Sequence, residues 1–189
     1  MANDGRWDLP VGGAWIRRAA PPDLDAAAAV LEDANRWLRS LGRTGWSEDS
    51  FTALDGRGRA QLVKALRVGG LYMARLSVDA PGRAEPAATV SLFDVDEVFW
   101  PGAPRDALYL HKLAVARRFA GLGLGRAIVE WAADRARDAG RPFLRLDCPR
   151  DNPRVRAYYE QAGFAHRGDL TAAGGFEAAL YERPTGPAE

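Results

Sequence analysis

The hydrophobic positions of this chain follow two spacings. In some stretches apolar residues recur about every three to four positions, which is typical of a helix with one buried face. In others a short apolar run is bounded by glycine, proline or aspartate, which is typical of a strand. These patterns predict helices over residues 24–41, 50–66, 124–139 and 153–162, and strands over residues 14–18, 71–78, 87–95, 108–115, 143–148, 164–167 and 176–181.

The order of these elements predicts a mixed α/β sheet in a single domain, because neither an internal repeat nor an interior linker interrupts it. We expect residues 1–189 to form this one domain, with a core from about 14 to 183 and flexible ends at 1–13 and 184–189. Residues 79–86 should form a hairpin loop. Asp23 and Asn152 precede predicted helices and should cap them.

Composition excludes several classes of partner. The chain has 47% hydrophobic and 27% charged residues and a net charge of +1, so we expect neither a nucleic-acid nor a membrane partner. It shows no signal peptide and no apolar run of membrane-spanning length. The single cysteine, Cys148, excludes an intrachain disulfide and agrees with a cytoplasmic location. Two histidines far apart show no zinc-site spacing, so we expect no metal.

The most informative stretch is a glycine-rich segment between a strand and a long helix. The apolar run ending at Val115 is followed by Gly121, Gly123 and Gly125, and then by the helix predicted over 124–139. Glycine lets the backbone approach a ligand closely, and the start of a helix carries unpaired N–H groups and partial positive charge. This combination predicts a site for a phosphate or pyrophosphate.

A dinucleotide is one candidate for this site. Asp147 ends the next strand, roughly where an acid that binds ribose would lie. However, the glycines are spaced G-x-G-x-G instead of G-x-G-x-x-G, and residues 116–120 separate the strand from them. The repeated βαβαβ pattern of dinucleotide-binding folds is also missing. These features argue against a dinucleotide.

Coenzyme A is the second candidate, and here the chain resembles a known family. Leu110-His-Lys-Leu-Ala-Val115 followed by Ala120-Gly-Leu-Gly-Leu-Gly-Arg126 is similar to the signature of GNAT-type N-acetyltransferases. Asn152-Pro-Arg-Val-Arg-Ala-Tyr-Tyr-Glu-Gln-Ala-Gly-Phe164 resembles a later motif of that family. The resemblance covers nearly the whole chain and is strongest from Leu110 to Phe164. It implies a mixed, mostly antiparallel central sheet flanked by helices and splayed between the strands ending at Val115 and Cys148.

The resemblance also implies roles for individual residues. Tyr159 would protonate the departing thiolate, since a phenol with a pKa of about 10 stays protonated at neutral pH. Backbone groups of the strand would hold the pantetheine arm and polarise the acetyl carbonyl. The implied coenzyme-binding residues are Leu113, Ala114, Val115, Ala120, Gly121, Leu122, Gly123, Leu124, Gly125, Arg126, Asn152 and Tyr159. One position departs from the family: Ala120 stands where Gln or Arg is usual, which predicts weaker coenzyme contacts.

Two further features have open interpretations. His111 lies in the strand beside these backbone groups and is either the base that deprotonates an amine or a packed core histidine. Strand alternation would place it on one face with residues 113 and 115. Asp94, Asp96 and Glu97 form an acidic run that is a solvated loop, a binding site for a cationic amine or the source of the base. Cys148 is not expected to act as a nucleophile, because direct transfer needs none.

The resemblance thus implies an acetyl-CoA-dependent N-acetyltransferase. The acceptor would be a primary amine of a small molecule or peptide, attacking directly while both reactants are bound. A non-catalytic acyl-CoA-binding sensor or scaffold and an antibiotic-modifying acetyltransferase are the alternatives. Either a monomer or a homodimer fits.

Overall fold

The computed structural model describes residues 5–43, 51–77 and 84–186. Its strands form an eight-stranded sheet in the order β1-β2-β3-β4-β5-β6-β8-β7. The chain divides into two compact units, the first made of Met1–Ser91 and Lys112–Ile128 and the second of Leu92–His111 and Val129–Glu189. The boundary therefore runs through β5, whose residues belong partly to each unit. Within the described residues, no helix combines the length and apolar character needed to cross a membrane.

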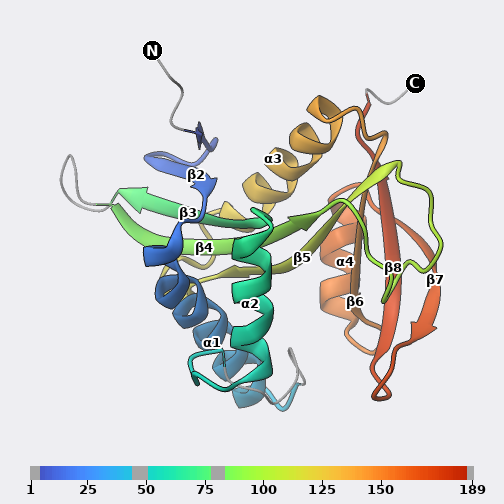
Figure 1. Cartoon of the computed structure of the whole chain (residues 1–189), viewed down its shortest axis with the longest axis horizontal. Helices are drawn as coiled ribbons and strands as arrows, with labels where there is room; N and C mark the ends of the chain where they lie inside the picture. Colours follow the sequence, from blue (N-terminus) through green and yellow to red (C-terminus); the bar gives the residue numbers. More distant parts are fainter. Residues whose placement is uncertain (1–4, 44–50, 78–83, 187–189) are drawn as a thin grey trace. The chain divides into compact units, whose positions relative to one another are not determined.

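The first unit holds the N-terminal antiparallel strands and two helices. β1 pairs with β2, β2 with β3 and β3 with β4, all antiparallel. Helices α1 and α2 contact each other and lie side by side (Figure 1). Ala27, Ala28 and Leu31 of α1 are fully buried. The elements are β1 (Arg6–Asp8), β2 (Ala14–Arg18), α1 (Leu24–Ser40), α2 (Arg57–Arg67), β3 (Leu71–Ser77) and β4 (Ala84–Phe93).

Asp23 lies in the short 3-10 turn Pro21–Asp23, immediately before α1, but it does not cap that helix with its side chain as expected. Its carboxylate accepts the backbone N–H of Ala20 at 2.8 Å and forms ion pairs with Arg17 at 2.8 Å and Arg75 at 3.1 Å. Burial acts to raise the pKa of Asp23, but these bonds outweigh it and lower that pKa. The buried acid therefore ties the start of α1 to β2 and β3.

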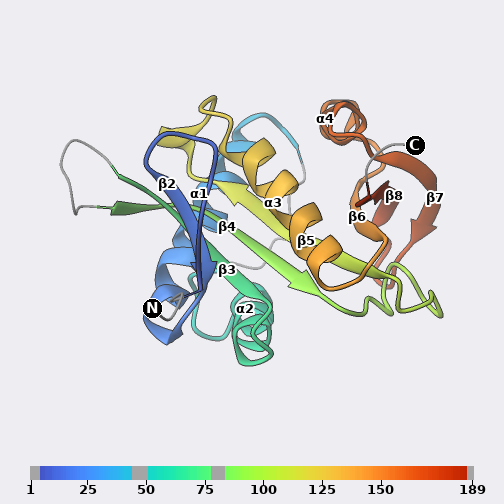
Figure 2. The ribbon, with the colours of Figure 1, turned by 90° about the horizontal axis from the view of Figure 1, so that it is seen from above.

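The second unit holds the C-terminal strands and α4. β5 runs parallel to β6, whereas β6 with β8 and β7 with β8 are antiparallel. Helix α4 contacts β6, and Figure 2 shows α4 beside the C-terminal strands. The second unit also contains Tyr109, Tyr181 and Leu144, which are among the largest fully buried side chains. Its elements are β6 (Phe143–Pro149), α4 (Pro153–Gln161), β7 (Ala165–Thr171) and β8 (Glu177–Pro184), together with parts of β5 (Ala107–Val115) and α3 (Leu124–Asp138), which belong partly to each unit.

The pairing of β5 with β6 runs from Ala107 and Phe143 to Leu110 and Leu146. His111 and Asp147 are the next residues on the two strands. Lys112 then adopts φ 51°, a left-handed conformation that is unusual for a residue other than glycine. The strict alternation expected along residues 110–115 is therefore wrong, because a left-handed residue interrupts the extended backbone.

Most predicted elements are confirmed, with one difference at a helix and three at the strands. The helix predicted over 50–66 is wrong at its start, because α2 begins only at Arg57, where the extended backbone of Gly56 gives way to the helix. β1 was not predicted, since its sequence Arg-Trp-Asp shows no apolar pattern. β4 begins at residue 84 and contains Pro86, which pairs with Arg75 beside a register shift at which Ala87 is an extra residue of β4. β7 and β8 are longer than predicted. Residues 78–83 of the expected hairpin loop, and residues 1–4 and 187–189 of the expected flexible ends, lie outside the described part of the chain.

Candidate active site

The glycine segment leads into α3 with an open backbone. Gly121 has φ 86° and Gly123 has φ 83°, conformations that favour glycine, and Gly125 lies in the first turn of α3. A Cβ atom added at Gly121 or Gly123 would meet nothing within 4 Å. The N–H of Ala127 bonds to the carbonyl of Gly123, and the N–H groups of Leu124 and Gly125 precede this first bond of the helix. The segment is therefore accessible and rich in donors, which fits a pyrophosphate.

The residues before the glycines are fixed by contacts within the first unit. Arg117 donates its backbone N–H to Asp33 at 2.7 Å and places its guanidinium 3.9 Å from the centre of the Trp37 ring. Arg118 pairs with Glu85 at 3.0 Å. The side chain of Arg118 is thus engaged next to β4, and Ala120 is exposed and brings no charge. Backbone groups, not side-chain cations, are what the segment between 120 and 124 offers to a ligand.

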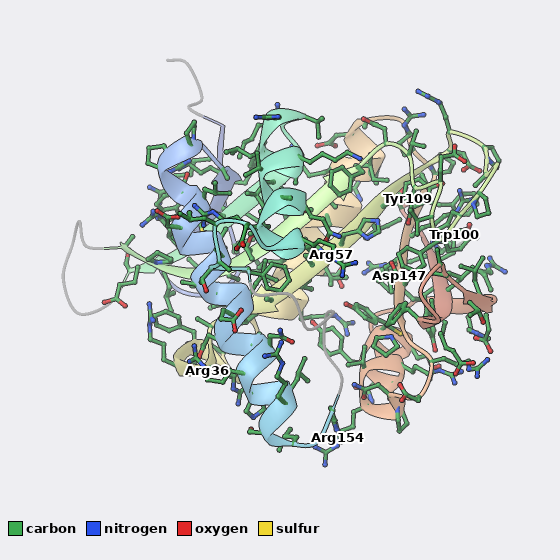
Figure 3. All side chains as sticks on the ribbon, turned by 60° about the horizontal axis from the view of Figure 1, so that its bottom comes forward. Arg36, Arg57, Trp100, Tyr109, Asp147 and Arg154 are labelled. Carbon is green, nitrogen blue, oxygen red and sulfur yellow. The ribbon has the colours of Figure 1, made fainter. Side chains whose placement is uncertain are left out.

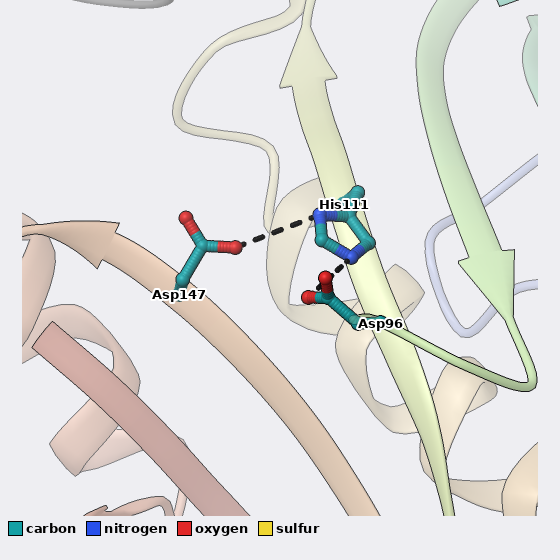
Figure 4. A group of neighbouring side chains, drawn as sticks. All are labelled: Asp96, His111 and Asp147. Carbon is teal, nitrogen blue, oxygen red and sulfur yellow. Dashed lines mark ion pairs between the residues drawn. The ribbon is translucent and has the colours of Figure 1, made fainter. Parts of the chain in front are cut away.

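His111 lies between two carboxylates of the second unit (Figure 4). Its Nε2 is 3.2 Å from Oδ2 of Asp96, and its Nδ1 is 3.5 Å from Oδ1 of Asp147. The side chains of His111, Asp96 and Asp147 are 19%, 6% and 12% exposed, respectively. The rings of Phe93 and Phe99 lie 5.6 Å and 6.3 Å from the imidazole. His111 is therefore a paired and partly accessible histidine, not a residue packed only against apolar neighbours.

Asp96 is the buried anchor of this group. Its Oδ1 accepts the backbone N–H groups of Val98 and Phe99, both at 3.1 Å. Burial acts to raise the pKa of Asp96, but the hydrogen bond and charge of His111 and these two N–H groups outweigh it and lower that pKa. Asp96 therefore remains a carboxylate while it faces the imidazole.

The acidic run of the loop does not form one cluster. Asp94 points to Arg141, 3.5 Å away, and Glu97 accepts the backbone N–H of Gly102 at 3.3 Å. Asp96 alone turns toward His111. The expectation that Asp94 and Glu97 join it in binding a cationic amine finds no support in these contacts.

The three residues Asp96, His111 and Asp147 also offer the donor types that metals bind, with atoms within 4.8 Å of one another. However, the two carboxylates face different nitrogens of the imidazole. A single ion could take only one of these nitrogens, so hydrogen-bonded pairing describes the arrangement better than a metal centre. The sequence did not predict this group.

Helix α4 carries the other two predicted residues of the second unit. Oδ1 of Asn152 accepts the N–H of Val155 at 3.3 Å, which confirms the predicted cap, and Asn152 is buried. Tyr159 is half-buried, with ring centres of Tyr158, Phe164 and Tyr181 at 5.2 Å, 5.7 Å and 6.5 Å. Burial, followed by the charges of neighbouring groups, raises the pKa of Tyr159 well above its usual range. The phenol therefore keeps its proton at any physiological pH.

Cys148, the residue after Asp147, is buried at the end of β6. Burial is the main cause that raises the pKa of its thiol to about 12. A thiol in this state is a poor nucleophile, because the thiolate is the reactive form. The structure thus agrees with the prediction that Cys148 takes no covalent part in the reaction.

A buried ion-pair network supports the paired ends of β5 and β6. Arg145 bonds to Asp106 and Glu182, both at 2.7 Å, and to the Tyr109 hydroxyl at 3.1 Å. Trp100 and Tyr109 lie beside each other (Figure 3), with ring centres 6.3 Å apart. Burial acts to lower the pKa of Arg145, but its partners outweigh this and raise it. Tyr109 and Arg145 of this network lie on the same strands as His111 and Asp147, respectively, and close to them in sequence.

The second unit therefore brings His111 together with Asp96 and Asp147, and it carries Asn152 just before α4 and Tyr159 on α4. The first unit carries residues 113–115 and 120–126. No local pattern in the sequence pointed to Asp96 or Asp147 as partners of His111.

Comparison with known proteins places this geometry in a family. A model of the Acetyltransferase (GNAT) family matches residues 31–164. The uncharacterized N-acetyltransferase YesJ of Bacillus subtilis (strain 168) is 28% identical over 151 residues, which are 77% of this chain and 78% of that protein.

Solved structures agree with this match. A GNAT-family acetyltransferase from Listeria monocytogenes 4b F2365 has a TM-score of 0.73 and 25% identity, covering 94% of this chain and 99% of its own. One from Streptococcus agalactiae 2603, at 19% identity and a TM-score of 0.65, covers 94% and 98% and shares the fold. The predicted fold class, a mostly antiparallel sheet flanked by helices, is confirmed. The protein belongs to the Acetyltransferase (GNAT) family.

Proposed function

We propose that this protein transfers an acetyl group from acetyl-CoA to a primary amine. The observation that carries the proposal is the open glycine backbone before α3, with Gly121 and Gly123 in left-handed conformations, in a chain of the GNAT family. Backbone N–H groups at a helix start suit the pyrophosphate of coenzyme A. Because the family model spans parts of both units, we further propose that they act as one acetyltransferase domain.

In this proposal the transfer is direct. The neutral amine attacks the thioester carbonyl carbon, a C–N bond forms and the C–S bond breaks, and the electron pair leaves on sulfur. Backbone groups of Leu113–Val115 stabilise the charge on the carbonyl oxygen. Tyr159 supplies the proton that the thiolate takes up, which its raised pKa supports, since the phenol stays protonated. His111 accepts the proton that the ammonium form of the acceptor must lose.

The remaining coenzyme-binding residues are Ala120, Leu122, Leu124, Gly125 and Arg126, beside the glycines, and Asn152. The buried amide of Asn152 supports such a role, since its Oδ1 already accepts a helix N–H and its amino group can still donate. The acceptor is a small molecule or a peptide, the active form is a monomer or homodimer, and we place the reaction in the cytoplasm.

The proposal is tested by coenzyme binding followed by an acetyl-transfer assay. Acetyl-CoA should raise the melting temperature of the protein, whereas NAD should not. Release of free thiol from acetyl-CoA should then depend on a primary amine when polyamines, amino acids, peptides and aminoglycosides are screened. Acetyl-CoA binding without transfer to any of these amines would favour a sensor or scaffold and would refute the proposed enzyme.

Tyr159 offers a matched pair of variants, because Tyr158 lies next to it on α4 and is 36% exposed. Tyr159→Phe should lower kcat by about 100-fold, the usual size of a general-acid contribution. It should leave the Kd for acetyl-CoA nearly unchanged. Tyr158→Phe should keep wild-type turnover. Equal activity of the two variants would remove Tyr159 as the proton donor.

A further inference from the structure

Two phenyl rings of the second unit contact each other at its surface. Phe99 belongs to the loop after β4, and Phe176 directly precedes β8. Their ring centres are 6.0 Å apart with an interplanar angle of 78°, which is the edge-to-face arrangement that aromatic pairs favour. Phe176 is 36% exposed and Phe99 is half-buried. This aromatic pair therefore leaves ring surface open to solvent.

Packing of the second unit does not account for this exposure. The aromatic side chains that fill its interior, Tyr109 and Tyr181, are 2% and 0% exposed. Burial is what makes a large aromatic side chain stabilise a fold, and the aromatic pair is only partly removed from water. Val98, next to Phe99 on the same loop, is 61% exposed. The loop thus presents apolar side chains to solvent, and neighbouring apolar groups at a surface mark a binding site.

Both members of the aromatic pair are held in place by their own backbones. Oδ1 of Asp96 accepts the N–H of Phe99 at 3.1 Å, while Oδ2 of Asp96 is 3.2 Å from Nε2 of His111. The carbonyl of Phe176 accepts the N–H of Ala172 at 2.9 Å across the turn before β8. Rings that are already positioned lose little conformational freedom when a ligand binds, which favours affinity.

The aromatic pair continues into the candidate active site. The ring of Phe99 lies 6.3 Å from the imidazole of His111, and the ring of Phe93 lies 5.6 Å from the same imidazole. The side chain of His111 is 19% exposed. A row of rings therefore runs from His111 through Phe99 to Phe176 within the second unit. A ligand with one end at His111 can lay an apolar end on the aromatic pair.

We infer that Phe99 and Phe176 form an aromatic subsite, which binds an aryl group of the acceptor. The inference rests on the proposed function and narrows its acceptor to an arylalkylamine, a primary amine joined to an aromatic ring by a carbon chain. An aryl ring buries the exposed surface of the pair and adds aromatic contacts to that burial. The 6.3 Å between Phe99 and His111 favours a short chain. Polyamines and aminoglycosides have no apolar end to cover these rings.

The test measures amine binding to the full-length protein, in the presence of coenzyme A and without acetyl transfer. The probe is para-fluorophenethylamine, whose ¹⁹F NMR signal broadens when it binds. Phenethylamine and ethylamine then compete with the probe, and they differ only in the aryl group. Phenethylamine should displace the probe at a concentration about tenfold lower or more, since even small apolar groups contribute that much in an apolar site.

Three variants locate the subsite. Phe176→Ala should weaken binding of the probe about tenfold and leave the affinity for ethylamine unchanged. Phe176→Leu keeps apolar area without the ring, so its affinity should lie between those of Phe176→Ala and the wild type. Val68→Ala removes an apolar side chain that is 64% exposed in the first unit, and it should bind the probe as the wild type does. A thermal melt of each variant confirms that it is folded.

The inference is overturned if ethylamine competes as well as phenethylamine, or if Phe176→Ala binds the probe with wild-type affinity. It is also overturned if sedimentation shows a wild-type dimer that Phe176→Ala converts to monomers, because a second copy of the chain would then cover the rings. Failure of the thiol-release assay would refute the proposed enzyme without changing these binding results. An active enzyme with equal kcat/KM for phenethylamine and ethylamine would overturn the aromatic subsite alone.

Discussion

Replacing Arg145 by methionine should destabilise the protein strongly, because it would leave buried acids without their partner. The side chain of Arg145 is 7% exposed, that of Glu182 9% and that of Asp106 30%. Removing one partner of a buried ion pair costs about 3–5 kcal/mol. Glu182 retains Arg167 at 2.9 Å, and water can reach Asp106, so we expect the lower end of this range, about 3 kcal/mol.

The assay is urea unfolding at pH 7 together with a thermal melt. At about 2–4 °C per kcal/mol for a chain of this size, Arg145→Met should lower Tm by roughly 6–12 °C. Arg167→Met removes another cation from the same Glu182, but Arg167 is 48% exposed, so the loss should be below about 1 kcal/mol. Equal losses of stability in the two variants would show that burial is not the reason for the contribution of Arg145 to the free energy of unfolding.

Four further predictions concern separate features of the molecule. Ala120→Arg should tighten acetyl-CoA binding about tenfold in calorimetry, by adding a cation at the proposed pyrophosphate site; an unchanged Kd would contradict the role given to residue 120. Gly123→Ala should lower the free energy of unfolding in urea by roughly 1 kcal/mol because of its φ of 83°, whereas Gly125→Ala, in the first turn of α3, should not. Asp23→Asn should be less stable than the wild type above pH 3.8. Because the pKa of Asp23 in the folded protein lies below 3.8, the difference in urea midpoint should vanish as the pH falls through that lowered pKa. A difference that does not change with pH would contradict a contribution from the ionised Asp23 carboxylate. Cys148, with a thiol pKa of about 12, should react with a thiol reagent at pH 8 only after urea is added; rapid labelling of the native protein would show that it is accessible.

Three of the four predicted helices were located closely because the residues that begin and end them are local signals, whereas α2 begins at Arg57 and not at residue 50. α1, α3 and α4 start where predicted and end within one residue of the predicted positions, since capping and glycine preferences act over a single turn. Strands were harder. The short charged β1 shows no period. Pro86 indicated a loop, although the register shift beside it, with Ala87 as an extra residue, allows the proline inside β4.

The candidate site likewise has one part that the sequence predicted and one part that it did not. The glycine segment could be found because its whole signal lies within a few consecutive residues. The group of Asp96, His111 and Asp147 could not, because it assembles a loop and two strands from distant parts of the chain. Asp96 looked like one of three loop acids, and nothing about Lys112 predicts a left-handed conformation, which lysine rarely adopts.

Neither compact unit is a continuous piece of chain, and this matters during synthesis on the ribosome. The first unit needs Lys112–Ile128 to be complete, and the second combines Leu92–His111 with the segment from Val129 onward. Domains that fold in order from the N-terminus emerge one after another, but here the nascent chain must expose residues of the second unit before the first can close. Completion of both units therefore belongs to the late stage of translation, and neither can be expressed alone by simple truncation.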